Sequence, residues 1–177
     1  MAASSSFPTT LSCVLALALL AATAASSAAA EKETHLCVFW HKTCGGPNVS
    51  TVAQVAEGPS SGASATGFGT VTVIDDPLTD GPNLTSSSSS KLVGRAQGVY
   101  VSAGKDALSL MIAMNFVFVD GAYNGSSLAI LGANPADRKV REMPVVGGTG
   151  AFRFARGWFD AKTGDATVEY NLYVRHD

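Results

Sequence analysis

The fold is decided by a glycine-rich stretch late in the chain, Val145-Val146-Gly147-Gly148-Thr149-Gly150-Ala151-Phe152-Arg153-Phe154-Ala155-Arg156-Gly157. Its glycines tolerate positive φ and allow another backbone to approach closely. After them, apolar and basic residues alternate with the period of a half-buried strand. A nucleotide-binding loop with similar glycines leads into a helix, which this alternation does not indicate. The stretch therefore predicts a glycine-pinched turn that enters a β-strand.

The same alternation recurs along the chain and predicts further strands. The strand predicted in the stretch above is Ala151–Arg156. Together with it, the predicted strands are Thr34–His41, Gly67–Ile74, Val93–Ser102, Leu108–Val119, Ser127–Leu131 and Thr167–Val174. Leu108–Val119 is apolar on both faces, so a helix is the alternative there, but its Phe and Val residues favour a strand. Short strands with scarcely any helical periodicity indicate a sandwich or a closed barrel. A strand apolar on both faces suits a barrel that holds an apolar ligand inside and contacts a subunit outside.

Two adjacent carboxylates interrupt this pattern at Asp75 and Asp76. We expect the strand to stop there, because Pro77 has no amide hydrogen to give to a β-ladder. The carboxylates are candidates for an acid–base pair, but neighbouring strand residues point to opposite faces, and a turn is favoured. The next segment, Asp80–Ser90, is rich in serine and is predicted to be a surface loop.

The N-terminal segment has the pattern of a secretory signal peptide. An apolar run, Leu11–Leu20, is followed by small residues that end at Ala30, before the charged Glu31. This order is typical of a cleaved export signal, whereas a membrane anchor, the alternative, needs roughly twenty apolar residues. We therefore predict a signal peptide at residues 1–30, a single secreted domain at residues 31–177 and no membrane partner.

The charge of the chain argues against a nucleic-acid partner. Lys and Arg number 12 and Asp and Glu 14, which gives a formal net charge of −2 with neutral histidine. No basic run is longer than two residues, whereas a nucleic-acid surface needs clustered cations.

Cysteine and histidine provide one candidate bond and no metal site. Cys13 lies in the signal segment, which leaves Cys37 and Cys44. A secreted protein allows a Cys37–Cys44 disulfide, but a straight strand that contained both residues would hold them too far apart, so both outcomes stay open. His35 and His41 lack the spacing of zinc ligands.

Three asparagines lie in glycosylation sequons, namely Asn48, Asn83 and Asn124. Each sequon is beside turn-forming residues, where a glycan can project into water. We predict that these asparagines are glycosylated.

The segment Asn134–Glu142 concentrates charged side chains. Such clusters are usually solvated loops. The functional alternative places Arg141, whose planar guanidinium suits an oxygen-rich ligand, at the mouth of an apolar barrel. No serine has a nucleophile-elbow sequence, so a hydrolytic triad is not predicted.

Several blocks, taken together and in order, resemble the dirigent family of plant proteins. They are Phe68-Gly69-Thr70-Val71, Asp75-Asp76-Pro77-Leu78-Thr79, Val93-Gly94-Arg95-Ala96-Gln97-Gly98-Val99-Tyr100, Met114-Asn115-Phe116-Val117-Phe118, Tyr123-Asn124-Gly125-Ser126 and Arg141-Glu142-Met143-Pro144-Val145-Val146-Gly147-Gly148-Thr149-Gly150. The resemblance covers essentially the whole chain after the signal segment. It implies an all-β, eight-stranded antiparallel β-barrel like that of allene oxide cyclase. It also implies a homo-oligomer, a trimer or a dimer, secreted to the cell wall (the apoplast).

The resemblance further implies a function in phenylpropanoid chemistry. Dirigent proteins bind phenoxy radicals or quinone methides from monolignols such as coniferyl alcohol and steer their reaction to one stereoisomer, as in lignan biosynthesis. A laccase or peroxidase performs the oxidation, so no cofactor is expected. The alternatives are a true cyclase or isomerase of phenylpropanoid or isoflavonoid precursors, and a cell-wall defence or lignin-scaffold protein.

The resemblance also assigns substrate-binding residues. Arg141 matches the pocket arginine of the family, and Tyr100 matches a pocket tyrosine. Phe39, in the aromatic first strand, is expected to line the same pocket. Arg141 would hold the oxygens of a phenolic ligand.

The chain departs from the lignan-forming branch at two pocket positions and from the family in general at a third place. An aspartate of that branch is replaced by Asn134, and another is replaced by Lys42. Asn134-Pro135 resembles a different branch, some of whose members cyclise isoflavonoid precursors. Asn134 and Asp137 therefore join Arg141 as catalytic candidates, with Asp137 as a substitute acid or base. After Gly157 the chain lacks several residues that are usual in the family, so a shortened strand is expected, with an open edge or compensation by its neighbours.

Overall fold

The described part of the chain is built from antiparallel strands. The structure is a computed structural model that describes residues 31–42, 50–59, 61–84, 90–164 and 167–177. Its strands are β1 (Lys32–Trp40), β2 (Val52–Ala56), β3 (Val71–Thr79), β4 (Leu92–Ser102), β5 (Leu110–Phe118), β6 (Ser127–Asn134), β7 (Val140–Thr149), β8 (Arg156–Thr163) and β9 (Val168–His176). Three short 3₁₀ turns accompany them within these residues, η1 (Ser61–Ala63), η2 (Gly121–Tyr123) and η3 (Gly150–Phe152).

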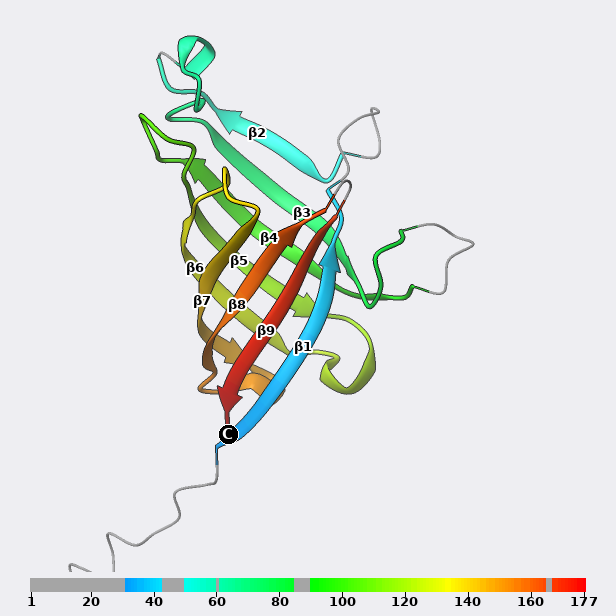
Figure 1. Cartoon of the computed structure of the whole chain (residues 1–177). Helices are drawn as coiled ribbons and strands as arrows, with labels where there is room; N and C mark the ends of the chain where they lie inside the picture. The colour runs from blue at the N-terminus through cyan, green and yellow to red at the C-terminus, as the bar shows by residue number, and fades with distance from the viewer. Residues whose placement is uncertain (1–30, 43–49, 60, 85–89, 165–166) are drawn as a thin grey trace, which may run out of the picture. The chain divides into compact units, whose positions relative to one another are not determined.

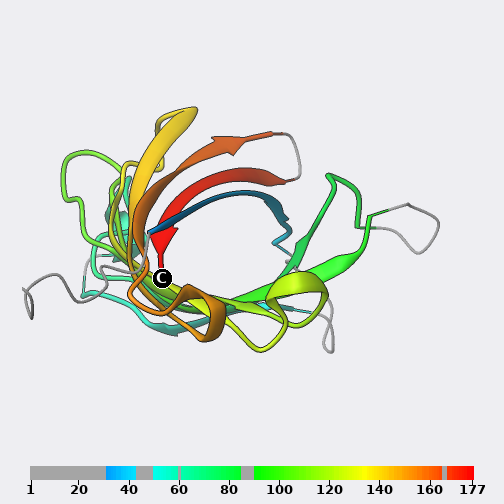
Figure 2. The ribbon, with the colours of Figure 1, turned by 90° about the horizontal axis from the view of Figure 1, so that it is seen from below.

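Eight of these strands close into a barrel. Hydrogen-bonded neighbours follow the order β1-β9-β8-β7-β6-β5-β4-β3-β2, and a further pairing joins β1 to β3. That pairing closes β1 and β3–β9 into a ring, while β2 adds to the sheet beside β3 (Figure 1). Seen from below, the strands curve around a common interior (Figure 2). The expected eight-stranded antiparallel β-barrel is confirmed.

The barrel closes where β3 changes its partner. The first half of β3, Val71–Ile74, pairs with β2, whereas Leu78 and Thr79 pair with Trp40 and Phe39 of β1. Pro77 follows the pairing with β2 and lies opposite His41, so the bond that its missing amide hydrogen removes is the return bond to His41. Its carbonyl accepts a hydrogen bond from the amide of His41 at 3.1 Å. The expectation that β3 stops at Asp75–Pro77 is therefore wrong.

The glycine-rich stretch folds differently from the expectation. Gly147 and Gly148 lie inside β7, and the turn comes later, at η3 and the residues before β8. A side chain on Gly148 would meet the carbonyl oxygen of Phe152 at 2.4 Å, so glycine allows the turn to fold back on its own strand. Phe154 adopts a φ of 59°, which no strand allows. The predicted strand Ala151–Arg156 is wrong, because its alternation belongs to this turn.

The strand that contains Gly157, β8, is paired with a neighbour on each side. β8 pairs with β9 along its whole length, from Arg156↔Arg175 to Thr163↔Val168. On its other side it pairs with β7, from Val140↔Lys162 to Val145↔Gly157. β8 is thus paired on both sides, while Val146–Thr149 of β7 extend beyond the register with β8. The shortening relative to the family stays a prediction.

The core lies inside the barrel. In β5, Ile112, Met114, Phe116 and Phe118 are buried and alternate with more exposed residues, which confirms the strand over the helix. The buried apolar residues of the other strands include Leu78, Leu128, Phe159 and Leu172, each without solvent exposure. Within the described residues, no helix is long and apolar enough to span a membrane. The predicted signal peptide at residues 1–30 lies outside the described residues.

Candidate functional site

A cavity of about 270 Å³ lies inside one end of the barrel. It is at the end where β1, β6 and β8 finish and where β7 and β9 begin. Its lining is mainly aliphatic and aromatic, with a few polar groups: Trp40, Lys42, Ile74, Tyr100, Leu110, Ile112, Met114, Asn134, Ala136, Arg141, Thr163, Val168 and Tyr170. An apolar cavity with few polar groups is the usual form of a small-molecule site.

Two small residues lie between pairs of residues that line the cavity. Gly98 lies between Ile74 and Met114 in one row of the sheet, and a side chain there would meet the carbonyl oxygen of Ala113 at 2.3 Å. Ala161 is fully buried between Arg141 and Tyr170 in another row. A side chain at position 98 would collide with β5, and a residue larger than alanine at position 161 would crowd Arg141 and Tyr170.

Arg141 and Asn134 line the cavity, and each has one buried hydrogen-bonding atom without a partner among the described residues. Their side chains come from the start of β7 and the end of β6, and each residue is 8% exposed. Nε of Arg141 and Oδ1 of Asn134 are buried, and neither has a partner among the described residues. Unpaired buried polar groups are rare in proteins and call for an explanation. The pair offers a ligand one charged donor and one acceptor.

Aromatic rings form one wall of the cavity. Trp40 and Tyr170 are tilted by 32° to each other, with ring centroids 6.2 Å apart. Tyr170 also contacts Phe116 and Phe159, at 5.3 and 5.1 Å between centroids. Burial raises the pKa of Tyr170 above its ordinary value; Arg141 lowers it and Asp76 raises it further. Tyr170 therefore stays a neutral phenol, within electrostatic range of both charged groups.

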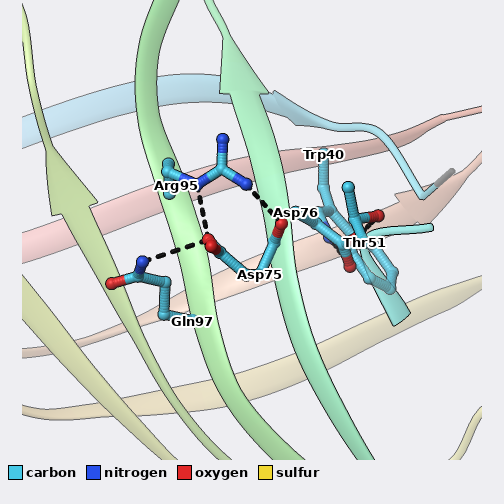
Figure 3. A network of polar contacts seen from close by, with 6 residues as sticks. All are labelled: Trp40, Thr51, Asp75, Asp76, Arg95 and Gln97. Carbon is cyan, nitrogen blue, oxygen red and sulfur yellow. Dashed lines mark hydrogen bonds and ion pairs between the residues drawn. The ribbon is translucent and has the colours of Figure 1, made fainter. Parts of the chain in front are cut away.

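Two neighbouring carboxylates flank this wall on opposite faces of β3 (Figure 3). Asp75 points outward and accepts hydrogen bonds from Nε of Arg95 at 2.5 Å and from Gln97 at 3.0 Å. These bonds hold the pKa of Asp75 below its ordinary value, chiefly through Arg95, although partial burial opposes them.

Asp76 points inward and is fully buried. Its Oδ2 accepts the indole N–H of Trp40 at 2.7 Å, and its Oδ1 accepts the hydroxyl of Thr51. Burial raises the pKa of Asp76 despite these two bonds. The expectation that the two carboxylates point apart is confirmed, but they lie within a strand and not in a turn.

The structure brings together Arg141, Asn134 and Tyr100, which all line the cavity. Phe39 alternates with Val38 and Trp40 on β1 and lies outside this lining. Asp137 is exposed in the turn between β6 and β7.

Sequence reasoning missed two residues of the cavity wall, Trp40 and Tyr170, and set aside Asp76 in favour of a turn. A signal for Trp40 was present: in a strand, a residue two positions from the buried Val38 faces the same side.

The other predicted modification sites stay predictions. Asn83 and Asn124 are exposed, whereas Asn48 and Cys44 lie outside the described residues. Cys37 is exposed on β1. Among the described residues, no group of three or more His, Cys, Asp or Glu is arranged to hold a metal ion.

Comparison with known proteins identifies the family. The family described as dirigent-like protein matches residues 33–175. Dirigent protein 21 of Arabidopsis thaliana is 50% identical over 153 residues, which cover 82% of this chain and 78% of that protein. Pterocarpan synthase 1 of Glycyrrhiza echinata is 48% identical over 154 residues, covering 82% of this chain and 79% of that protein.

A solved structure supports the same assignment. The pterocarpan synthase dirigent protein GePTS1 superposes with a TM-score of 0.71 at 47% identity, covering 82% of this chain and 89% of that one. With a family match over nearly all described residues and relatives of about this identity, the chain belongs to the dirigent protein family.

Proposed function

We propose that the cavity binds a phenol-derived quinone methide and directs its ring closure to one stereoisomer. The observation that carries this proposal is the unpaired Arg141 Nε and Asn134 Oδ1 in an aromatic-lined interior. A phenolic oxygen accepts a hydrogen bond and a hydroxyl donates one, so a ligand with both groups satisfies the two side chains. Trp40 and Tyr170 supply surfaces on which an aromatic ring packs.

The chemistry needs only groups that the chain has, together with water. When a hydroxyl of the ligand attacks the methide carbon, a C–O bond forms and the electron pair moves to the quinone oxygen. That oxygen becomes a phenolate, which Arg141 stabilises as the charge develops. The attacking hydroxyl donates a hydrogen bond to Oδ1 of Asn134. Its proton passes to water, and the phenolate oxygen takes up a proton from water. The step is an isomerisation, so atoms and electrons balance without an oxidant.

The similarity to pterocarpan synthases supports ring closure over radical coupling. Lignan-type coupling of phenoxy radicals is the second candidate, which the similarity to the dirigent proteins of Arabidopsis supports. In that reaction the same cavity would bind radicals made by an external laccase or peroxidase. The assay below separates the two.

The proposal includes secretion and assembly. Residues 1–30 would direct the chain to the apoplast. A second copy of the chain would cover the outward-facing apolar residues of β3–β6, which we name the aliphatic surface. Their cross-strand register forms two rows, Val73–Val99–Ala113–Leu131 and Val71–Val101–Met111–Ala133. Val73, Met111 and Leu131 are 43%, 43% and 49% exposed, and such continuous apolar surfaces usually mark interfaces.

The test is a chiral product analysis with and without laccase. The substrates are coniferyl alcohol and a hydroxylated isoflavonoid that forms a quinone methide on loss of water. We expect an enantiomeric excess from the isoflavonoid without laccase. Arg141→Leu should abolish it, and Asp137→Ala, at the exposed turn, should keep it.

The alternative outcomes are distinct. An excess from coniferyl alcohol that needs laccase would move the assignment to radical coupling. Racemic products throughout would reject both functions for these substrates. A loss of selectivity in Asp137→Ala would assign to Asp137 the acid or base role that the sequence suggested.

A further inference from the structure

One hydrogen bond joins the cavity wall to a carboxylate that does not itself line the cavity. Trp40 is part of the lining, and its indole N–H bonds Asp76 at 2.7 Å. Asp76 is fully buried and lies outside the described lining. Its second oxygen is occupied by Thr51. Asp76 can therefore act on a ligand only through the groups that it binds (Figure 3).

Packing alone does not explain a carboxylate at this position. The row of the sheet that contains Asp76 continues with Ala96 and Phe116, both fully buried. An aliphatic side chain would fit such apolar surroundings without the desolvation that an ionised carboxylate suffers. We therefore look for the role of this carboxylate in its hydrogen-bond partners, and the partner that lines the cavity is Trp40.

Trp40 needs such an anchor. It is the last residue of β1 and pairs with Leu78 on one side and Val168 on the other. Its contact with Tyr170 is tilted by 32° at 6.2 Å between centroids, which is a loose contact compared with a close stack. The indole N–H is a single directional donor, so its bond to Asp76 fixes the plane of the ring.

We propose that Asp76 is a positioning residue, which holds the indole of Trp40 as a fixed aromatic wall for the ligand. The inference rests on the proposed function, because it requires the cavity to be the ligand site. A fixed wall presents one face of a planar intermediate to attack. Loss of the anchor would therefore reduce affinity and stereoselectivity together.

The test uses the two tryptophans of the chain. Trp158→Phe removes the exposed one, which lies outside the cavity lining, and leaves Trp40 as the only reporter. In this background, coniferyl alcohol and the isoflavonoid genistein are titrated, and the emission of Trp40 is recorded. Asp76→Leu should shift the Trp40 emission and weaken binding by about tenfold. Asp76→Asn should retain most of the affinity, because its amide oxygen still accepts the indole N–H.

A double-mutant cycle tests whether Asp76 acts on the ligand through Trp40. For variants that lack both tryptophans, binding is measured by equilibrium dialysis with tritium-labelled genistein. Trp40→Phe keeps an aromatic ring but removes the donor. If Asp76 acts through Trp40, Asp76→Leu has no further effect on affinity in the Trp40→Phe protein. The matched control is Asp75→Leu, which removes the adjacent carboxylate on the outer face. It should leave affinity and selectivity unchanged.

Each outcome decides between the claims. Equal dissociation constants for Asp76→Leu and the parent protein, with only a lower melting temperature, would overturn the positioning role. Additive losses in the double variant would show that Asp76 touches the ligand directly, which also overturns it. If Asp76→Leu does not fold, Trp40→Phe and Asp76→Asn still test the inference. It requires that Trp40→Phe loses ligand affinity and that Asp76→Asn retains it. Failure of the parent protein to bind either phenol would reject the proposed function and this inference with it.

Discussion

Arg141 and Tyr170 lie two strands apart in the same row of the barrel interior, with only Ala161 between them. The register pairs Arg141 with Ala161 across β7 and β8, and Ala161 with Tyr170 across β8 and β9. A buried phenol and a buried guanidinium thus line one cavity on either side of Ala161, whose side chain is one methyl group. The arrangement favours a ligand that carries an oxygen for Arg141 and a ring for Tyr170.

Arg141→Met should lower selectivity and raise stability. The variant removes a buried donor that no protein group satisfies, and such a donor costs about 1–3 kcal/mol. We expect a gain in the free energy of unfolding of that order, measured by urea denaturation, and racemic products in the chiral assay. A loss of stability would mean that Arg141 is a structural residue rather than one kept for binding.

Gly98→Ala should destabilise the barrel, and Gly147→Ala should not. The new methyl group at position 98 would lie 2.3 Å from the carbonyl oxygen of Ala113, whereas nothing lies within 4 Å at position 147. Forced overpacking typically costs about 1–3 kcal/mol, so thermal unfolding should separate the two variants by several degrees. Equal melting temperatures would show that β4 and β5 can move apart freely.

Much of the barrel was predictable because it follows from local alternation. The predicted strands Val93–Ser102 and Leu108–Val119 correspond to β4 and β5. Alternation says nothing about which distant strands pair. For that reason the sequence could not show that Pro77 falls between two partners of β3.

The candidate site was predictable only in part. Family resemblance supplied Arg141, Asn134 and Tyr100, all of which reach the cavity. The role of Asp76 depends on Trp40 and Thr51, which lie 36 and 25 positions away in sequence. No local pattern joins these residues, because the barrel closure brings them together.

Leu131→Glu should dissociate the proposed oligomer. Leu131 is 49% exposed within the aliphatic surface, and a carboxylate buried in an apolar interface without a partner is strongly unfavourable. Light scattering after size-exclusion chromatography should show a smaller species than the parent protein. Val146→Glu is the matched control, since Val146 is 54% exposed on β7, outside that surface. If both variants keep the mass of the parent, another face forms the contact or the protein is a monomer.

The two neighbouring carboxylates should affect stability in opposite directions as the pH changes. Burial raises the pKa of Asp76 above its unfolded value, so the folded state binds more protons at intermediate pH. The contribution of Asp76 to stability therefore falls as the pH rises from about 4, the ordinary pKa of aspartate, through the raised value. For Asp75, the hydrogen bond from Arg95 lowers the pKa. Its contribution is present above about pH 4 and is lost as the pH falls through the lowered value.

Asparagine variants measure each contribution by difference. The free energy of unfolding of the parent protein minus that of Asp76→Asn should decrease with rising pH. The same difference for Asp75→Asn should increase with pH at the acid end, between the lowered pKa and the ordinary one. Urea denaturation between about pH 3 and pH 7 covers the windows that start from the ordinary pKa. If the two differences in the free energy of unfolding change with pH in the same direction, Asp75 and Asp76 do not lie in opposite environments. That result would also contradict the buried state of Asp76 with its bond to Trp40.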